Sequence, residues 1–123
     1  MEIHELAAVA AARAGHAEPW LEFIRYPALS VGLYVLEPGE PDRQSPHTED
    51  EIYYVVEGRG RITVGADVQA VGPGAVVYVA TALPHHFHDI TERLTLLVVF
   101  APAEGSLAQA RRRQIKPRAA DRH

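Results

Sequence analysis

Two short stretches of the chain combine histidine and carboxylate side chains at spacings that allow metal chemistry. The first contains His47 and Glu51, four residues apart, and the second is the run from His85 to Asp89. Imidazole and carboxylate together suit a borderline divalent ion such as Fe(II), Mn, Ni, Zn or Cu(II). Because the chain has no cysteine, disulfides, thiolate metal sites, iron–sulfur clusters and a thiol nucleophile are excluded. The seven histidines are therefore the main source of chemistry.

His47 and Glu51 can share one ion only if the chain turns between them. A helix is disfavoured, since Pro46 precedes the pair and β-branched and aromatic residues follow it. On a straight strand, four residues separate two side chains by about 13 Å, which is too far for one ion. The polar segment 48–50 is typical of a turn. Taken alone, the pair has two interpretations: half of a metal site, or a surface histidine beside an acidic turn.

The second stretch reads as the start of a strand. With alternating side chains, His85, Phe87 and Asp89 face one side and His86 and His88 face the other. Either set can line the interior of a folded domain.

The rest of the chain predicts the scaffold. Residues 3–14 are rich in alanine and precede Gly15, which favours a helix of about three turns. Beyond Pro19 come short β-prone runs, separated by glycine-containing turns such as Gly58-Arg59-Gly60. The runs are residues 21–24, 33–36, 52–56, 61–64, 68–71, 76–79 and 94–100. About seven strands with no helix between them predict an antiparallel sandwich or barrel rather than a parallel α/β sheet.

The first histidine-containing stretch resembles one of the two motifs of the cupin superfamily. In that motif a glycine is followed by His-x-His, a glutamate and a second glycine. Here Gly39 opens the motif, Ser45-Pro46-His47 occupies the His-x-His position, Glu51 follows, and Gly58 closes it.

The second stretch resembles the other cupin motif, in which a glycine precedes Pro-x-Gly and a histidine. Here Gly74 opens the motif, Ala80-Thr81-Ala82 occupies the Pro-x-Gly position, and His85 falls on the histidine. This alignment leaves His86 and His88 on the outer face. The replacement of proline and glycine by alanines bears on the rigidity of the loop rather than on metal ligation.

The resemblance covers about residues 28–101 and implies an all-β fold, an antiparallel jelly-roll barrel, with a short N-terminal helix. It also implies one divalent metal ion per chain (Fe, Mn, Zn, Ni or Cu), held by His47, Glu51 and His85. Ser45 replaces the first histidine of the motif, so water, substrate or the adjacent Gln44 completes the shell. The alternative is a degenerate cupin in which His47 and Glu51 only hydrogen-bond inside the barrel.

Four further residues have predicted roles in or near the expected metal site. Tyr53 shares the alternation of Glu51 and is a candidate catalytic group that orients a substrate or donates a proton. Its alternative role is core packing with its hydroxyl satisfied. Ser45 and Phe87 are expected in the pocket wall, and Glu49 in the solvated turn.

Two classes of function remain open for such a protein. Two histidines and one carboxylate with open positions resemble non-haem Fe(II) oxygenase sites and also serve zinc or manganese Lewis-acid chemistry. This predicts a dioxygenase, isomerase or lyase acting on a small organic molecule. The alternative is a non-catalytic module that binds a small ligand or a metal.

The charge of the chain is unevenly distributed. Residues 1–110 carry six basic and fifteen acidic groups, whereas residues 111–123 carry six basic groups and one acidic group. An acidic domain is a poor nucleic-acid binder, so no nucleic-acid partner is expected. The predicted organisation is a helical segment over 1–19, a barrel over 20–103 and a flexible basic tail over 104–123.

Location and assembly follow from similar arguments. No apolar stretch approaches the about 18 residues that span a bilayer, and the first five residues lack the basic start of a secretory signal. A cytoplasmic protein without a membrane partner is therefore expected. An open-ended barrel leaves strand edges to cover, so the N-terminal helix and the first strand are expected to build a homodimer.

Overall fold

The computed structural model describes residues 1–43 and 48–106. These residues form one helix and six strands: α1 (Leu6–Ala14), β1 (Trp20–Tyr26), β2 (Leu29–Leu36), β3 (Asp50–Val64), β4 (Asp67–Val71), β5 (Val76–Val79) and β6 (His85–Ala101). Within this part of the chain, no helix is long and apolar enough to cross a membrane.

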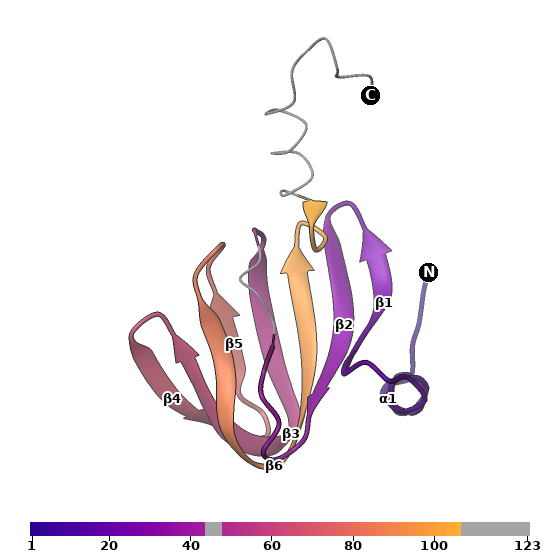
Figure 1. The fold of residues 1–123 in the computed structure, drawn as a ribbon. Helices are drawn as coiled ribbons and strands as arrows, with labels where there is room; N and C mark the ends of the chain where they lie inside the picture. Colours follow the sequence, from indigo (N-terminus) through magenta and orange to yellow (C-terminus); the bar gives the residue numbers. More distant parts are fainter. Residues whose placement is uncertain (44–47, 107–123) are drawn as a thin grey trace, which may run out of the picture.

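All six strands belong to one antiparallel sheet. The order across the sheet is β1-β2-β6-β3-β4, and β5 pairs with β3. The sheet curls, so that β4 and β5 lie on one side and β1 and β2 on the other, with β3 and β6 between them (Figure 1). The prediction of an antiparallel all-β fold with an N-terminal helix is confirmed, although the sheet is curled rather than closed.

The two longest strands, β3 and β6, are neighbours in the interior of the sheet. They pair from Asp50↔Ala101 to Val64↔His85, with register shifts between Val55 and Arg61. The sequence predicts a turn at residues 58–60, and this prediction is wrong. The chain instead runs through as one bent strand, in which Gly58 has a φ of +95°.

The core lies on the concave face of the curled sheet. Along β3, Glu51, Tyr53 and Val55 are buried, while Ile52 and Tyr54 point outward and are exposed. This alternation of period two is what a sheet with one buried face requires. The largest fully buried apolar side chains of the main core are aromatic and aliphatic groups on the inner faces of the strands: Tyr53, Phe87, Phe100, Leu94 and Leu96.

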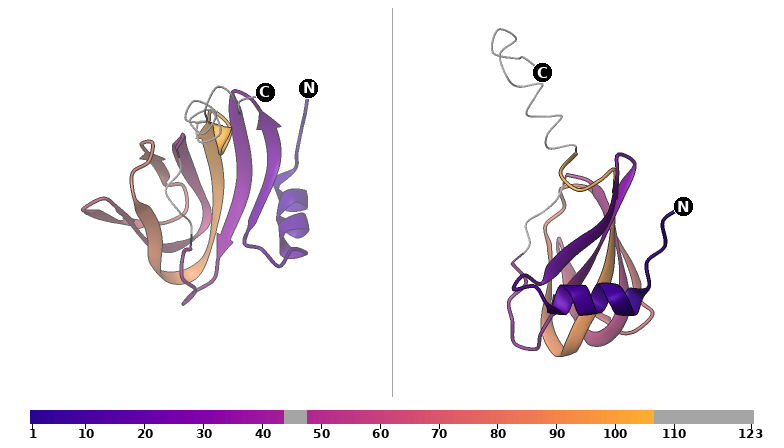
Figure 2. Two further views of the ribbon diagram at one scale, coloured as in Figure 1. Left: turned by 45° about the horizontal axis from the view of Figure 1, so that its top comes forward. Right: turned by 90° about the vertical axis from the view of Figure 1, so that its right-hand side faces the viewer.

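Helix α1 covers part of the outer face. Its buried residue, Val9, packs in a small cluster with Leu33 and Val35 of β2. The helix crosses the sheet beside β1 and β2 (Figure 2). Strand β1 is the edge of the sheet on this side, and its pairing with β2 has an irregularity between Glu22 and Ile24.

The homodimer remains a prediction that solution measurements can check. An unpaired strand edge offers hydrogen-bonding groups to a second copy, so β1 is a suitable place for a two-fold contact. Light scattering at tens of micromolar is expected to give about twice the chain mass of 13.5 kDa. Removal of residues 111–123 is the control and is expected to leave that mass ratio unchanged, whereas a monomeric mass for the full chain would contradict the prediction.

Candidate metal centre

Three buried polar side chains meet on the concave face. Strand β3 contributes Glu51 and Tyr53, and the first residue of β6 contributes His85. The side chains of His85 and Glu51 are only 2% and 1% exposed. A buried charge needs a partner, because its desolvation is costly.

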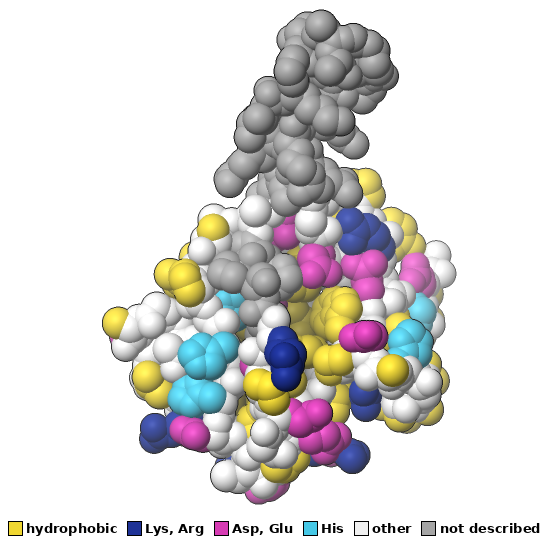
Figure 3. Space-filling view, in the orientation of Figure 1, with side chains coloured by type: hydrophobic (Ala, Val, Ile, Leu, Met, Phe, Trp, Pro, Cys, Tyr) yellow, Lys and Arg dark blue, Asp and Glu magenta, His cyan; other side chains and the backbone are white. Residues whose placement is uncertain are grey.

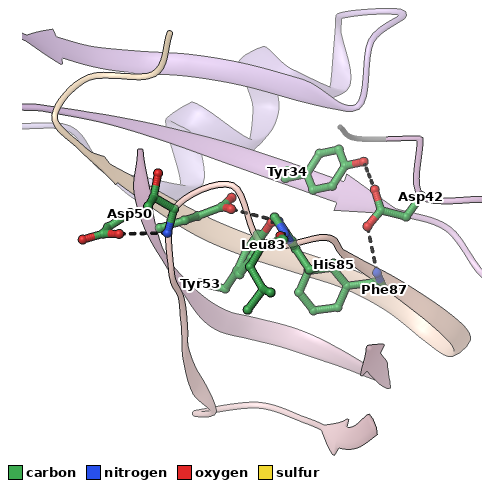
Figure 4. Close-up of polar contacts among 9 residues, drawn as sticks. Tyr34, Asp42, Asp50, Tyr53, Leu83, His85 and Phe87 are labelled. Carbon is green, nitrogen blue, oxygen red and sulfur yellow. Dashed lines mark hydrogen bonds and ion pairs between the residues drawn. The ribbon is translucent and has the colours of Figure 1, made fainter. Parts of the chain in front are cut away.

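The distances within this group are short. His85 Nε2 lies 2.9 Å from Glu51 Oε1 and 3.0 Å from the hydroxyl of Tyr53. On its other side, His85 Nδ1 donates a hydrogen bond of 2.7 Å to the carbonyl oxygen of Leu83 (Figure 4). That bond fixes the ring so that Nε2 faces the carboxylate, as metal-ligating histidines are commonly oriented.

The close contact between His85 Nε2 and the Glu51 carboxylate requires a proton or a metal ion between the two groups. A carboxylate oxygen only accepts, so Nε2 must hold a proton or share a metal ion with it. Burial lowers the pKa of His85, but the bonds to Glu51 and to the Leu83 carbonyl outweigh burial and raise it. Among the described residues, neither carboxylate oxygen of Glu51 has a well-aligned hydrogen-bond donor. A divalent ion would satisfy these oxygens, so the donor chemistry fits a metal.

A cavity opens beside Glu51. Its volume is about 340 Å³, within the usual range for small-molecule sites. Four aromatic rings line it, those of Trp20, Tyr34, Tyr53 and Phe100. Hydrophobic side chains gather near the middle of this face, with acidic side chains beside them (Figure 3). A bound molecule would therefore contact both the aromatic wall and the carboxylate.

Comparison with known proteins identifies the family. The cupin domain family model matches residues 32–100, which is more than half of the chain. The chain belongs to the cupin family. It is also 46% identical over 104 residues to the uncharacterized protein SCO3923 of Streptomyces coelicolor, covering 85% of this chain and 99% of that one.

Solved structures agree with this assignment of the fold. TT1209 from Thermus thermophilus matches with a TM-score of 0.68 and 26% identity, covering 84% of this chain and 99% of that one. KdgF from Halomonas sp. matches with a TM-score of 0.63 and 19% identity, covering 71% and 83% of the two chains.

The two cupin motifs are held together by hydrogen bonds between their loops. The backbone N–H of Thr81 donates to Asp50 Oδ1 at 3.0 Å, and the Thr81 hydroxyl donates to the carbonyl oxygen of Thr48. Ala82, in the position where the family motif has glycine, adopts a φ of +58°. A left-handed backbone is costly for alanine, so the loop carries some strain at this position.

Asp42, which the sequence analysis missed, also links separate segments by hydrogen bonds. Its carboxylate accepts hydrogen bonds from the Tyr34 hydroxyl at 2.6 Å and from the Phe87 backbone N–H at 2.8 Å (Figure 4). Burial and the bond to Asp42 raise the pKa of Tyr34, so the phenol stays protonated and donates. Asp42 thus ties β2 to the beginning of β6, just after His85.

Glu49 differs from its predicted place. The sequence suggests a solvated turn residue, but Glu49 is 1% exposed. Its carboxylate accepts from the backbone N–H of Gly105 at 2.8 Å and from the Thr48 hydroxyl at 2.6 Å. The segment just before β3 is therefore fixed to the chain that follows β6.

The predicted site residues fall into three groups. The structure brings Glu51, Tyr53 and His85 together. Phe87 is buried behind Tyr53, with ring centroids 4.9 Å apart, rather than in the wall of the cavity that Glu51 lines. Three predicted residues lie outside the described part of the chain: Gln44, Ser45 and His47.

Within residues 1–43 and 48–106, no three histidine or acidic side chains converge as a complete metal-binding group. Glu51 and His85 supply two donors. His86 is exposed and His88 is partly exposed, and their rings lie 5.0 Å apart, away from the buried pair. The described residues therefore supply no third protein ligand beside this pair.

Proposed function

We propose that this cupin is a metal-dependent enzyme that acts on a small organic molecule in the cavity beside Glu51. The observation that carries the proposal is the buried carboxylate of Glu51, which faces His85 Nε2 at 2.9 Å without a well-aligned donor among the described residues. Glu51 and His85 would hold the ion, with His47 as third ligand. Gln44, water or substrate would complete the shell, as Ser45 replaces the first histidine.

The chain's own groups define what the site does. A bound divalent ion would supply Lewis-acid polarisation of a carbonyl or carboxylate oxygen. Tyr53 places a hydroxyl 3.0 Å from His85 Nε2 and also lines the cavity, so it is positioned to orient a substrate or to pass a proton. Aromatic rings line the same space. These features favour isomerase, lyase or dioxygenase chemistry.

A non-catalytic metal-binding or ligand-binding module is the second candidate. The serine at position 45 favours it, because the chain then offers fewer protein ligands than the full cupin set. Cupins of either kind share the fold, so the fold does not decide between them.

Elemental analysis of protein purified without chelator tests the first step of the proposal. Up to one divalent ion per chain is expected. An oxygen-uptake screen and a screen for isomerisation or elimination over small carbonyl acids then test for turnover. Protein that carries no metal and takes up none on titration with Fe(II), Mn or Zn would contradict the proposal.

Ser45→His separates the enzyme from the binding module. A fourth protein donor is expected to tighten metal binding, and in an enzyme it also lowers turnover, because it fills the position open to substrate. A non-catalytic module would show only the first effect. Metal affinity and activity are measured on both variants loaded with Fe(II), Mn or Zn. Unchanged metal affinity would mean that position 45 does not face the ion, and Gln44 would become the better candidate.

A further inference from the structure

The cavity beside Glu51 has walls made of aromatic rings set at steep angles to one another. The Trp20 indole stands at 72° to the Tyr34 ring and at 76° to the Phe100 ring, with centroid separations of 6.3 and 6.0 Å. Tyr53 lines the same space. Rings at such angles contact one another edge to face rather than in a stack, so they present differently oriented surfaces to the cavity that they line.

Gly32 determines how Trp20 presents its ring. A methyl group built on Gly32 would lie 2.1, 2.4 and 2.6 Å from three adjacent atoms of the indole. Such similar distances place Gly32 beneath the ring face rather than at its edge. The indole therefore lies flat on β2, and its opposite face is turned to the cavity that it lines.

The charges around the cavity favour a cation. Among the described residues, Glu51, Glu18 and Glu104 line it, against one basic residue, Arg43. A simple organic anion would face the carboxylates of Glu18 and Glu104, while Glu51 faces His85 and the proposed ion. A positive group would face carboxylates and ring faces, which both attract cations. Arg43 is available for an anionic or polar end of the same molecule.

We propose that this cavity binds a small molecule with a quaternary onium head, such as a trimethylammonium group, enclosed by Trp20, Tyr34 and Phe100. Aromatic boxes bind such heads because the negative ring faces attract a cation that carries no strong hydrogen-bond donors. The polar end of the ligand then points toward Glu51 and His85. This assignment rests on the proposed metal-dependent function, since it names the substrate class of the same site.

The test compares choline with 3,3-dimethylbutan-1-ol, which has the same shape but a neutral carbon in place of nitrogen. Isothermal titration of the full chain is expected to show choline binding at least about tenfold more tightly. Equal affinity for the two compounds, or no binding of choline, would overturn the proposal.

Substitutions test whether the preference for choline over the neutral alcohol depends on the Trp20 ring. Trp20→Leu keeps an apolar wall but removes the ring, so the preference for choline is expected to fall about fivefold or more. Tyr78→Leu, the same kind of change at a side chain 61% exposed on β5, is the control and should leave it unchanged. If Trp20→Leu does not fold, Gly32→Ala replaces it, since the new methyl group displaces the indole. A preference that survives in the folded variant would overturn the assignment.

Metal content measured on the same samples separates this inference from the proposed function. Metal-loaded protein that does not prefer choline contradicts the onium site and leaves the metal proposal standing. Protein that binds no metal contradicts the proposed function, whatever its ligand preference.

Discussion

His85→Ala is expected to lose most of the bound divalent metal, with metal affinity lowered by at least about 100-fold. The change removes one of the two proposed ligands among the described residues, and it leaves the buried carboxylate of Glu51 without its imidazole neighbour. Loss of an outer-shell partner alone typically costs about 10–100-fold in metal affinity, and loss of a direct ligand costs more. Elemental analysis and competition against a chelating dye measure the effect.

The neighbouring residue provides a matched control. His86→Ala removes the same imidazole one position along the strand, where the side chain is exposed and points away from Glu51. It is expected to keep full metal content. Glu51→Gln keeps the shape of the other ligand but removes its charge, and is expected to weaken binding as well. Unchanged metal content in both His85→Ala and His47→Ala would rule out the site.

The convergence of Glu51 and His85 shows what kind of sequence information predicts a site. Neither residue is informative alone, since each sits in an ordinary strand pattern. The spacing of the two cupin motifs predicts that they meet, and the alternation of β3 predicts that Tyr53 joins them. The pairing of β3 with β6 does not explain this meeting, since His85 lies opposite Val64 and Glu51 lies opposite Phe100. Glu51 instead pairs with Val79 at the end of β5, and the short loop 80–84 leads from Val79 to His85.

The residues that sequence analysis missed have partners far along the chain. Glu49 is buried because it binds the backbone of Gly105, 56 positions away. Asp42 bonds the backbone of Phe87, 45 positions away. A carboxylate in a polar loop gives no local sign of such a bond, so its sequence context predicts solvent exposure. Only the packed fold shows that both carboxylates fix the ends of the segment around the first motif.

The same limit applies to glycine. The sequence predicts turns at both Gly58 and Gly74, and both have a positive φ, +95° and +89°. In the structure, Gly74 lies in the loop before β5, where an added methyl group would have nothing within 4 Å, whereas Gly58 lies inside β3 against β6. A positive φ is thus common to a turn and to a bent strand, and local sequence does not separate them.

Gly58→Ala is expected to lower the free energy of unfolding by about 3–5 kcal/mol, and Gly74→Ala by about 1–2 kcal/mol. Both changes place alanine in a left-handed backbone, which is the smaller cost. At Gly58 the new methyl group would also lie 2.0 Å from the carbonyl oxygen of Arg93 and 2.7 Å from the Cα of Leu94. These are backbone atoms of the central strand, so they cannot move aside without separating β3 from β6.

Urea denaturation of the two variants and the wild type measures the difference. Because domains of this kind are stable by about 5–15 kcal/mol, Gly58→Ala is expected to remove a large part of the total. Equal costs at the two positions would mean that backbone strain alone explains Gly58. A larger cost at Gly58 would show that the closing glycine of the first cupin motif is required by the close approach of two strands. That approach bends β3 and β6 together, and the bend gives the sheet the concave face on which Glu51 and His85 meet.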